Sequence, residues 1–325
     1  MQSMDHEVLA QTLQWLEGGV DAWLCTIVTT VCSSPRLVGS IVAVSANGQQ
    51  IGSVSGGCVE EDLLERIAAG EFPRDRSTLV DYGLSAEENE RLGLPCGGRM
   101  SLLLQALGQK DAGWVRQILD ALHDRCIASR TVSLGSGETL VSTVPEFQEL
   151  QIDQQQLQQC FGPRQRMLLV GAGQLATTLS ELAQAMDYEV IVTDPRENLL
   201  NQWNGPAVEL VQGMPDDVVR DRASDSHSLV ITLTHDPRID DMALMEALES
   251  DAWYVGALGS MRTTEKRILR LRQLGISEDA IARMRAPVGI SIGSKTPLEI
   301  AISIMAELTA LRARAGTTAY AATNL

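Results

Sequence analysis

The chain has 325 residues, of which 44% are hydrophobic and 21% charged, as in a soluble globular protein with room for two domains. Its formal net charge of −16 argues against nucleic acid or an anionic membrane as the general partner. An anionic ligand would therefore have to be held by local donors. No apolar run reaches the roughly 18 residues that span a bilayer, so we expect no membrane partner.

The cysteines and the first residues bear on the compartment. The six cysteines are scattered without close pairs, which is neither a disulfide framework nor a zinc ribbon. The N-terminus lacks the basic and apolar regions of a signal peptide. A cytoplasmic, reducing location is the expectation.

The first half of the chain combines helical spacing with β-branched runs. It predicts a helix over 8–16, a strand over 23–31, a hairpin over 41–54 and strands over 78–82 and 100–104. A polar, glutamine-rich segment at 151–163 ends in Gly162-Pro163 and is the expected linker. We therefore expect one domain over 1–150 and a second over 164–325.

One candidate site is a glycine loop that carries a cysteine. Ser55-Gly56-Gly57-Cys58-Val59-Glu60 precedes a run with helical spacing, which places Cys58 at a helix N-terminus. Gly56 and Gly57 let the backbone approach a ligand, and free N–H groups with the helix dipole favour an anion or a thiolate. Such a cysteine is a nucleophile or a soft ligand. The alternative is a small buried hydrophobe in a tight turn.

Two further loops of this half carry candidate residues. Cys96 and Gly97 place a second cysteine beside paired glycines at the start of a strand. Together, Cys58 and Cys96 could form a joint site for a soft metal or for sulfur, or they could belong to two unrelated loops. Ser34 and Arg36 lie in a loop that suits an oxyanion, the alternative being a polar turn with a solvated arginine.

The second half opens on a strand, a G-x-G-x-x-A turn and a helix start over 166–176. The next apolar strand ends at Asp194, about 20 residues beyond the glycines, where a ribose-binding acid is expected. Gly171, Gly173, Gln174 and Asp194 are therefore predicted to bind a dinucleotide or a similar ligand. The alternative is a nucleotide fold that has lost its ligand.

Later strands of this half, each followed by a helical run, predict an α/β fold with a doubly wound, Rossmann-like parallel sheet. Ligands of such sheets bind at the carboxyl ends of strands. Gly259 and Ser260 precede a helix that bears Arg262, and this group could take a phosphate. His235 follows another strand and is a candidate acid–base group, although most histidines at such places only form local hydrogen bonds.

Six segments carry an ordered set of motifs: Ser33-Ser34-Pro35-Arg36, Ser55 to Glu60, Gly93 to Gly98, Thr234-His235-Asp236-Pro237, Val255 to Ser260 and Ala286-Pro287-Val288-Gly289. This set resembles the XdhC/CoxI family, accessory proteins of xanthine dehydrogenase and related molybdenum hydroxylases. One feature departs from the family pattern: Gln174 stands where the family usually carries His, and Gln cannot relay a proton or bind a metal as His does.

The resemblance implies a chaperone that binds molybdenum cofactor, as molybdopterin or in a dinucleotide form. It would support sulfuration of the cofactor beside a cysteine desulfurase and deliver it to an apo-molybdoenzyme of the xanthine dehydrogenase or aldehyde oxidase type. Cys58 and Cys96 would be soft ligands or persulfide carriers, and Arg36 an anion donor. The alternative is an NAD(P)-dependent oxidoreductase with His235 as the acid–base group. Catalysis and exchange of elements within a homodimer stay open.

Overall fold

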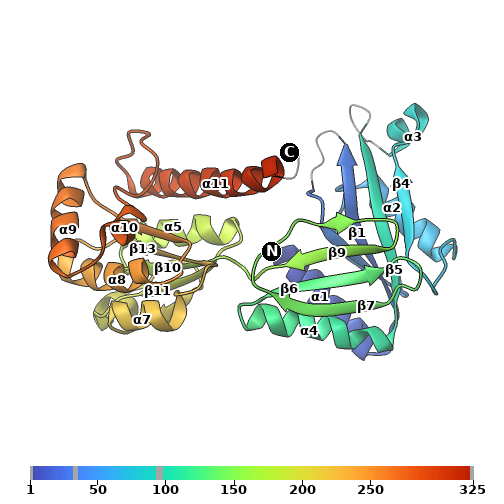
Figure 1. Ribbon diagram of the computed structural model, residues 1–325, viewed down its shortest axis with the longest axis horizontal. Helices are drawn as coiled ribbons and strands as arrows, with labels where there is room; N and C mark the ends of the chain where they lie inside the picture. Colours follow the sequence, from blue (N-terminus) through green and yellow to red (C-terminus); the bar gives the residue numbers. More distant parts are fainter. Residues whose placement is uncertain (1–2, 32–35, 93–97, 323–325) are drawn as a thin grey trace. The chain divides into compact units, whose positions relative to one another are not determined.

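The computed structural model describes residues 3–31, 36–92 and 98–322. It divides into two compact units, Met1–Pro163 and Arg164–Leu325 (Figure 1). No helix among the residues described is long and apolar enough to cross a membrane.

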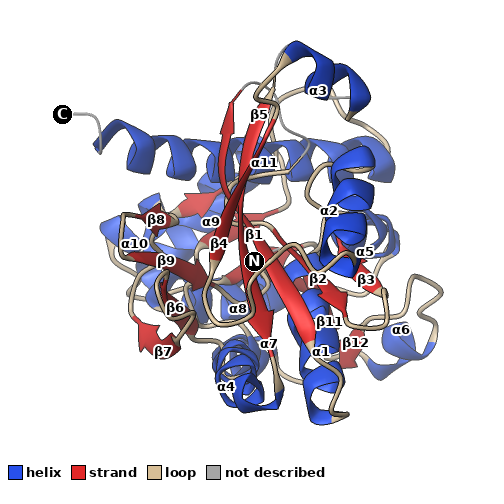
Figure 2. Ribbon diagram, turned by 90° about the vertical axis from the view of Figure 1, so that its right-hand side faces the viewer, coloured by secondary structure: helices blue, strands red, loops and turns tan. Residues whose placement is uncertain are grey.

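The first unit is built on two antiparallel sheets. Its elements are α1 (Ser3–Glu17), β1 (Ala22–Val31), β2 (Ile41–Ser45), β3 (Gln50–Gly52), α2 (Cys58–Ala68), β4 (Thr78–Tyr82), α3 (Ala86–Arg91), β5 (Arg99–Leu107), a 3-10 turn at Gln109–Asp111, α4 (Ala112–His123), β6 (Ile127–Ser133), β7 (Thr139–Val144), β8 (Gln151–Ile152) and β9 (Gln156–Phe161). One sheet has the order β3-β2-β1-β5-β4 and the other β7-β6-β9-β8. Figure 2 shows the long, twisted strands β1, β4 and β5 of the larger sheet.

Alternation along β1 sends its side chains into two cores. Leu24 packs with residues of α1 and α4 on one face of the sheet. Cys25 packs on the other face with Val59 and Leu63 of α2, and burial raises the pKa of the Cys25 thiol to about 12. Val59 and Leu63 thus fix the helix that begins at Cys58.

Residues 151–163, expected as a linker, contain strands instead. β9 pairs with β6 over its whole length. Gln159 is buried, accepting a hydrogen bond from Nε of the buried Arg130 at 3.0 Å and donating to the Gly39 carbonyl at 2.6 Å. Gln159 therefore serves buried polar groups, whereas most of the other glutamines of the segment are exposed. The boundary between the two units falls between Pro163 and Arg164.

The second unit is a six-stranded sheet between helices. Its elements are β10 (Arg166–Val170), α5 (Gln174–Ala185), β11 (Glu189–Thr193), α6 (Glu197–Asn201), β12 (Glu209–Val211), α7 (Pro215–Arg222), β13 (Ser228–Thr232), α8 (Pro237–Glu249), β14 (Tyr254–Ala257), α9 (Met261–Gln273), α10 (Glu278–Ala282), β15 (Met284–Arg285) and α11 (Pro297–Ala322). All strand pairs are parallel, in the order β12-β11-β10-β13-β14-β15, which is the Rossmann order.

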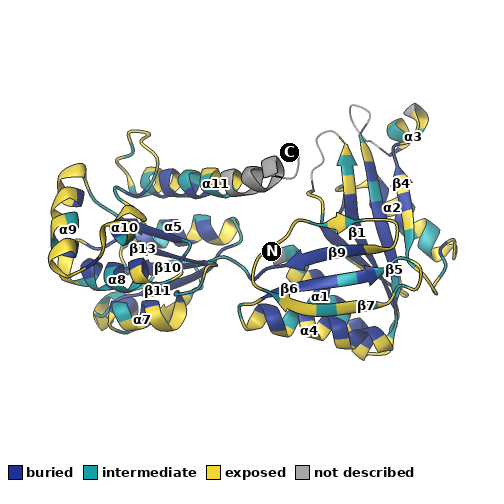
Figure 3. Cartoon of the chain, viewed as in Figure 1, coloured by how far each residue is buried: buried dark blue, intermediate teal, exposed yellow. Residues whose placement is uncertain are grey.

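Helices cover both faces of this sheet. Residues of α5 and α11 pack on one face, and residues of α7, α8 and α9 on the other. The central strands β10, β11 and β13 are buried almost throughout (Figure 3). The predicted doubly wound parallel sheet is confirmed, and its carboxyl edge is where ligands of this fold bind.

Candidate functional site

A cavity of about 840 Å³ lies at the carboxyl ends of β10 and β13 in the second unit. Three helices begin at this cavity: α5 at Gln174, α8 at Pro237 and α11 at Pro297. The first N–H groups of a helix have no partner within it, and its dipole is positive at that end. The N-terminus of α5 has no side-chain cap and favours an anionic ligand, whereas N–H groups in the first turns of α8 and α11 already donate to Asp236 and Thr296.

The two glycines of the predicted turn line this cavity and differ in what they require. Gly171 has a φ of 113°, and a Cβ there would lie 2.7 Å from Cγ2 of Thr234, so only glycine fits. Gly173 has a φ of −99°, which any residue adopts, and a Cβ there would meet no atom within 4 Å. Nothing in the fold demands glycine at 173, and the open space above it suits a ligand that approaches the backbone.

These two positions form a matched pair for mutagenesis. Gly171→Ala should lower the free energy of unfolding of the second unit by about 1–3 kcal/mol, because of its backbone strain and the Thr234 contact. Gly173→Ala should leave stability unchanged but obstruct the ligand. Thermal unfolding and ligand titration of both variants would test this, and equal destabilisation by the two would contradict it.

Asp194, the expected ribose-binding acid, is buried and already bonded. Its carboxylate accepts the N–H of Ala172 at 3.0 Å and two guanidinium N–H groups of Arg196 at 2.8 and 2.9 Å. Burial would raise the pKa of Asp194, but the hydrogen bonds from Arg196 and Ala172 outweigh it and lower the pKa. The carboxylate therefore holds the glycine turn and an arginine, and no open oxygen is left for a ribose.

Cationic side chains gather at the cavity, in a chain whose net charge is −16. The exposed His235 lines it, as does Gln174 at the start of α5, and their roles stay predictions. Lys295, which the sequence offers for a ligand phosphate or for solvent, also lines it. So do Arg196 and Arg238, which the sequence motifs did not predict. For the two arginines a signal was present, since each closes an Asp-Pro-Arg sequence, one directly after β11 and the other four residues beyond the end of β13.

Gly259, Ser260 and Arg262 are not among the residues that line this cavity. The Ser260 hydroxyl caps α9 by accepting the N–H of Thr263 at 3.2 Å, so its oxygen is engaged within the helix. Arg262 is exposed. A phosphate site on these three residues stays a prediction, separate from the cavity.

Cys58 is exposed and is the first residue of α2, as the sequence predicted. The N–H groups of Gly56 and Gly57, however, donate to the Glu60 carboxylate at 2.9 and 3.0 Å. A glutamate at the third helical position reaches back to the N-terminal loop, as in a capping box. The loop thus binds an anion of its own, and these two N–H groups are not available to a ligand.

The Glu60 carboxylate collects further donors from the same loop. The N–H groups of Val54 and Ser55 donate at 2.9 and 2.8 Å, and the Ser53 hydroxyl at 2.7 Å. The Ser55 hydroxyl also donates to it. Burial opposes ionisation, but the hydrogen bonds from Ser55, Gly56 and Ser53 outweigh it and lower the pKa of Glu60 to about 2. Glu60 therefore fixes the backbone that presents the Cys58 thiol.

The remaining predicted residues of the first unit are placed only in part. Arg36 is half-buried in the segment between β1 and β2. Ser34, Cys96 and Gly97 lie outside the described residues, so a joint site of Cys58 and Cys96 stays a prediction. Within residues 3–31, 36–92 and 98–322, no group of three His, Cys, Asp or Glu side chains could hold a metal ion.

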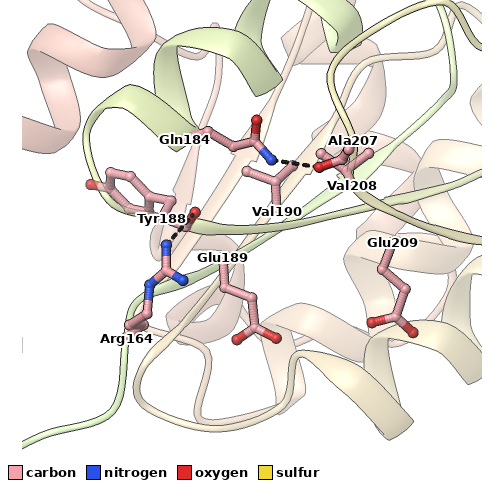
Figure 4. Close-up of a pocket in the computed structure, with 8 residues that line it drawn as sticks. All are labelled: Arg164, Gln184, Tyr188, Glu189, Val190, Ala207, Val208 and Glu209. Atoms are coloured by element: carbon pink, nitrogen blue, oxygen red, sulfur yellow. Dashed lines mark hydrogen bonds between the residues drawn. The ribbon is translucent and has the colours of Figure 1, made fainter. Parts of the chain in front are cut away.

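A second cavity, of about 540 Å³, lies at the amino ends of β11 and β12 (Figure 4). Arg164 donates to the Tyr188 carbonyl at 3.3 Å and forms an ion pair with Asp187. Glu189 and Glu209 on its wall pair with Arg166 and Arg222. Its charges are thus balanced, and it lies at the edge of the sheet opposite to the one where Rossmann ligands bind.

Comparisons with known proteins agree with this division into two units. Residues 15–83 match the XdhC and CoxI family, and residues 167–308 match the XdhC Rossmann domain. The chain is 28% identical to a probable xanthine dehydrogenase subunit of Bacillus subtilis (strain 168), over 92% of this chain and 96% of that protein. It is 29% identical to the molybdenum cofactor insertion chaperone PaoD of Escherichia coli (strain K12), over 95% of this chain and 89% of PaoD.

A solved structure extends the comparison to the fold. The crystal structure of a xanthine dehydrogenase from Bacillus halodurans matches with a TM-score of 0.75 and 27% identity, covering 95% of this chain and 96% of that one. The similarity therefore spans both units and both candidate regions, the Cys58 loop and the cavity of the Rossmann unit. The chain belongs to the XdhC/CoxI family.

Proposed function

We propose that this protein binds molybdenum cofactor, supports its sulfuration and delivers it to an apo-enzyme of the xanthine dehydrogenase type. The observation that carries the proposal is the similarity to the insertion chaperone PaoD over 95% of this chain. A cysteine desulfurase and the apo-molybdoenzyme are the proposed partners.

The cavity of the Rossmann unit fits the phosphate-bearing part of this cofactor. It offers the open space above Gly173, the uncapped N-terminus of α5 and the side chains of Arg196, Arg238 and Lys295. The side chains of Gln174 and His235 add hydrogen-bonding groups, which suit the polar edge of a pterin. The donors present therefore match a ligand that is anionic at one end and polar along its ring.

The exposed thiol of Cys58, in the first unit, is proposed separately as a soft ligand or persulfide carrier for this cofactor. Molybdopterin supplies the dithiolene and the bound molybdenum, and a thiolate is a ligand that soft metal–sulfur centres accept. Glu60 would position Cys58 by holding the loop before it. Cys96 stays a proposed second thiol.

The competing function is that of an NAD(P)-dependent oxidoreductase. The Rossmann strand order and the glycine turn favour it. Against it stands the Asp194 carboxylate, which is bonded to Arg196 and Ala172 instead of facing a ribose. His235 would be the acid–base group, and it is exposed at the cavity rim.

The test is to incubate the full chain with molybdenum cofactor, re-isolate it and measure bound molybdenum and pterin. Cys58→Ser should lose most of the retained cofactor, because it lacks the soft ligand, while keeping its fold. Cys126→Ser is the matched control, since Cys126 is the other exposed free cysteine described in this unit. Retained cofactor should also activate an apo-molybdoenzyme of the xanthine dehydrogenase type.

Parallel titrations with NAD and NADP separate the two functions. Pterin binding at about one per chain without nicotinamide binding supports the chaperone. Tight binding of NAD or NADP with no pterin retained would contradict the proposal and support the oxidoreductase. Equal retention by Cys58→Ser and the unaltered protein would remove Cys58 from the site.

A further inference from the structure

The sequence Asp-Pro-Arg occurs at 194–196 and again at 236–238. Both copies adopt the same hydrogen-bonding pattern. In the first, Oδ1 of Asp194 accepts the backbone N–H and Nε–H of Arg196 at 3.0 and 2.8 Å, and Oδ2 accepts Nη2 at 2.9 Å. In the second, Asp236 binds Arg238 through the same atoms at 3.0, 3.1 and 2.8 Å. Each arginine is thus held in a forked ion pair by the aspartate two residues before it.

The two Asp-Pro-Arg segments stand on either side of the glycine turn. β11 and β13, which they follow, are the two neighbours of β10, and the turn follows β10. Both arginines line the cavity. The two segments also lie within electrostatic reach of each other. The hydrogen bond to Asp194 raises the pKa of Arg196, and the charge of Asp236 raises it further.

Each ion pair leaves donors for a ligand. A guanidinium carries five N–H groups, and the aspartate side chain takes one on Nε and one on Nη2. The two N–H groups on Nη1 and the second N–H group on Nη2 of each arginine are left to donate to phosphate oxygens. Because the aspartate already fixes the guanidinium plane, little side-chain freedom is lost when a ligand binds.

We propose that Arg196 and Arg238 form a clamp for a diphosphate that lies over Gly173. The cavity then takes ligands in which a diphosphate joins a nucleoside to a second group. Applied to molybdenum cofactor, the inference rests on the proposed function. It then predicts that the cavity binds the dinucleotide form of the cofactor in preference to the form with a single phosphate. Asp194 becomes a positioning residue for Arg196, so ribose hydroxyls contribute little to affinity.

The experiment is calorimetric titration of the full chain with ADP and CDP, which share a diphosphate and differ in base. AMP and CMP test for the second phosphate, and 2′-deoxy-ADP tests for the ribose hydroxyl. The variants are Arg196→Gln and Arg238→Gln. Arg220→Gln is the control, because Arg220 also forms a forked ion pair, with Glu246, but does not line the cavity.

Both diphosphates should bind, and each clamp variant should weaken them by about 10- to 100-fold, the effect of losing a charge-assisted hydrogen bond. The monophosphates should bind at least about tenfold more weakly, 2′-deoxy-ADP should match ADP, and Arg220→Gln should change nothing. The side chain of Arg238 is 88% exposed, so its replacement tests the clamp without disturbing the fold.

Absence of diphosphate binding, or unchanged affinity in both clamp variants, would overturn the inference. Weaker binding of the deoxynucleotide would overturn the role given to Asp194. The outcome is separable from that of the proposed function. Pterin retention without diphosphate binding would support the chaperone function and contradict the clamp. Diphosphate binding that depends on the clamp arginines, without pterin retention, would support the clamp and contradict the chaperone function.

Discussion

Glu60→Gln is expected to loosen the loop before Cys58 and to abolish an acid-sensitive part of the stability of the first unit. The buried Glu60 carboxylate accepts four backbone N–H groups and two hydroxyls, and an amide can satisfy only part of them. With its pKa lowered from 4.5 to about 2, the ionised carboxylate contributes about 3 kcal/mol at neutral pH.

The sign of the pH dependence follows from the lowered pKa. The contribution of Glu60 is present in full above pH 4.5 and is lost as the pH falls toward 2. The unaltered protein should therefore lose stability over this range more steeply than Glu60→Gln. Glu61→Gln is the control, because Glu61 is the next residue of the helix and is exposed.

Hydrogen exchange gives the most local measurement of this effect. The amides of residues 54–57 donate to Glu60, so a peptide that contains them should exchange faster in Glu60→Gln than in Glu61→Gln. Retained protection in Glu60→Gln would show that the loop is held by other contacts. Alkylation of Cys58 in the same variants would show whether the loop also sets access to the thiol.

Much of the fold could be predicted from the sequence because its signals are local. The glycine turn at 171–173, the apolar run before it and the acid at 194 are diagnostic of the Rossmann unit, and its parallel sheet formed as expected. β9 was missed because its glutamines resemble a solvated linker. Only Gln159 of them is buried, and it is bonded to Arg130 of β6, which also donates to Thr26 at 2.6 Å. Such a partner cannot be found from composition.

The candidate site was predicted less completely because its chemistry depends on which groups are already paired. Asp194 and the N–H groups of Gly56 and Gly57 have the positions that the motifs suggest. The structure gives each of them an internal partner: Arg196 for the aspartate, and Glu60 for the glycines. The repeated Asp-Pro-Arg sequence and the glutamate at the third helical position were the signals that could have revealed this.

Asp240→Leu is expected to destabilise the second unit by about 3 kcal/mol, because it removes the hydrogen-bonded counter-ion of the buried Arg267 and leaves it with the more distant carboxylate of Asp241, 4.0 Å from Nε. Oδ2 of Asp240 accepts Nη2 of Arg267 at 2.9 Å, and Oδ1 accepts the hydroxyl of Thr234 at 2.7 Å. Arg267 in turn donates to the Leu258 carbonyl at 3.1 Å. The pair therefore joins the ends of β13 and β14, where Thr234 and Leu258 line the cavity.

Hydrogen exchange of the β13 and β14 amides would measure the loss, with Asp217→Leu as control. Asp217 pairs with Arg220 on the exposed surface, where removal of an ion pair costs about 0–1 kcal/mol. Unchanged protection of both strands in Asp240→Leu would contradict the predicted role of this ion pair.

The double variant Asp240→Leu, Arg267→Met separates charge from packing. Burial raises the pKa of Asp240 in spite of the hydrogen bonds from Thr234 and the charge of Arg267, so ionisation at this position is costly. Replacing both charges by apolar groups should therefore recover part of the stability that Asp240→Leu loses. The ligand affinity of the double variant should remain below that of the unaltered protein, since Thr234 and Leu258 lose the groups that hold them. Recovery of stability together with full affinity would show that the ion pair does not position the cavity.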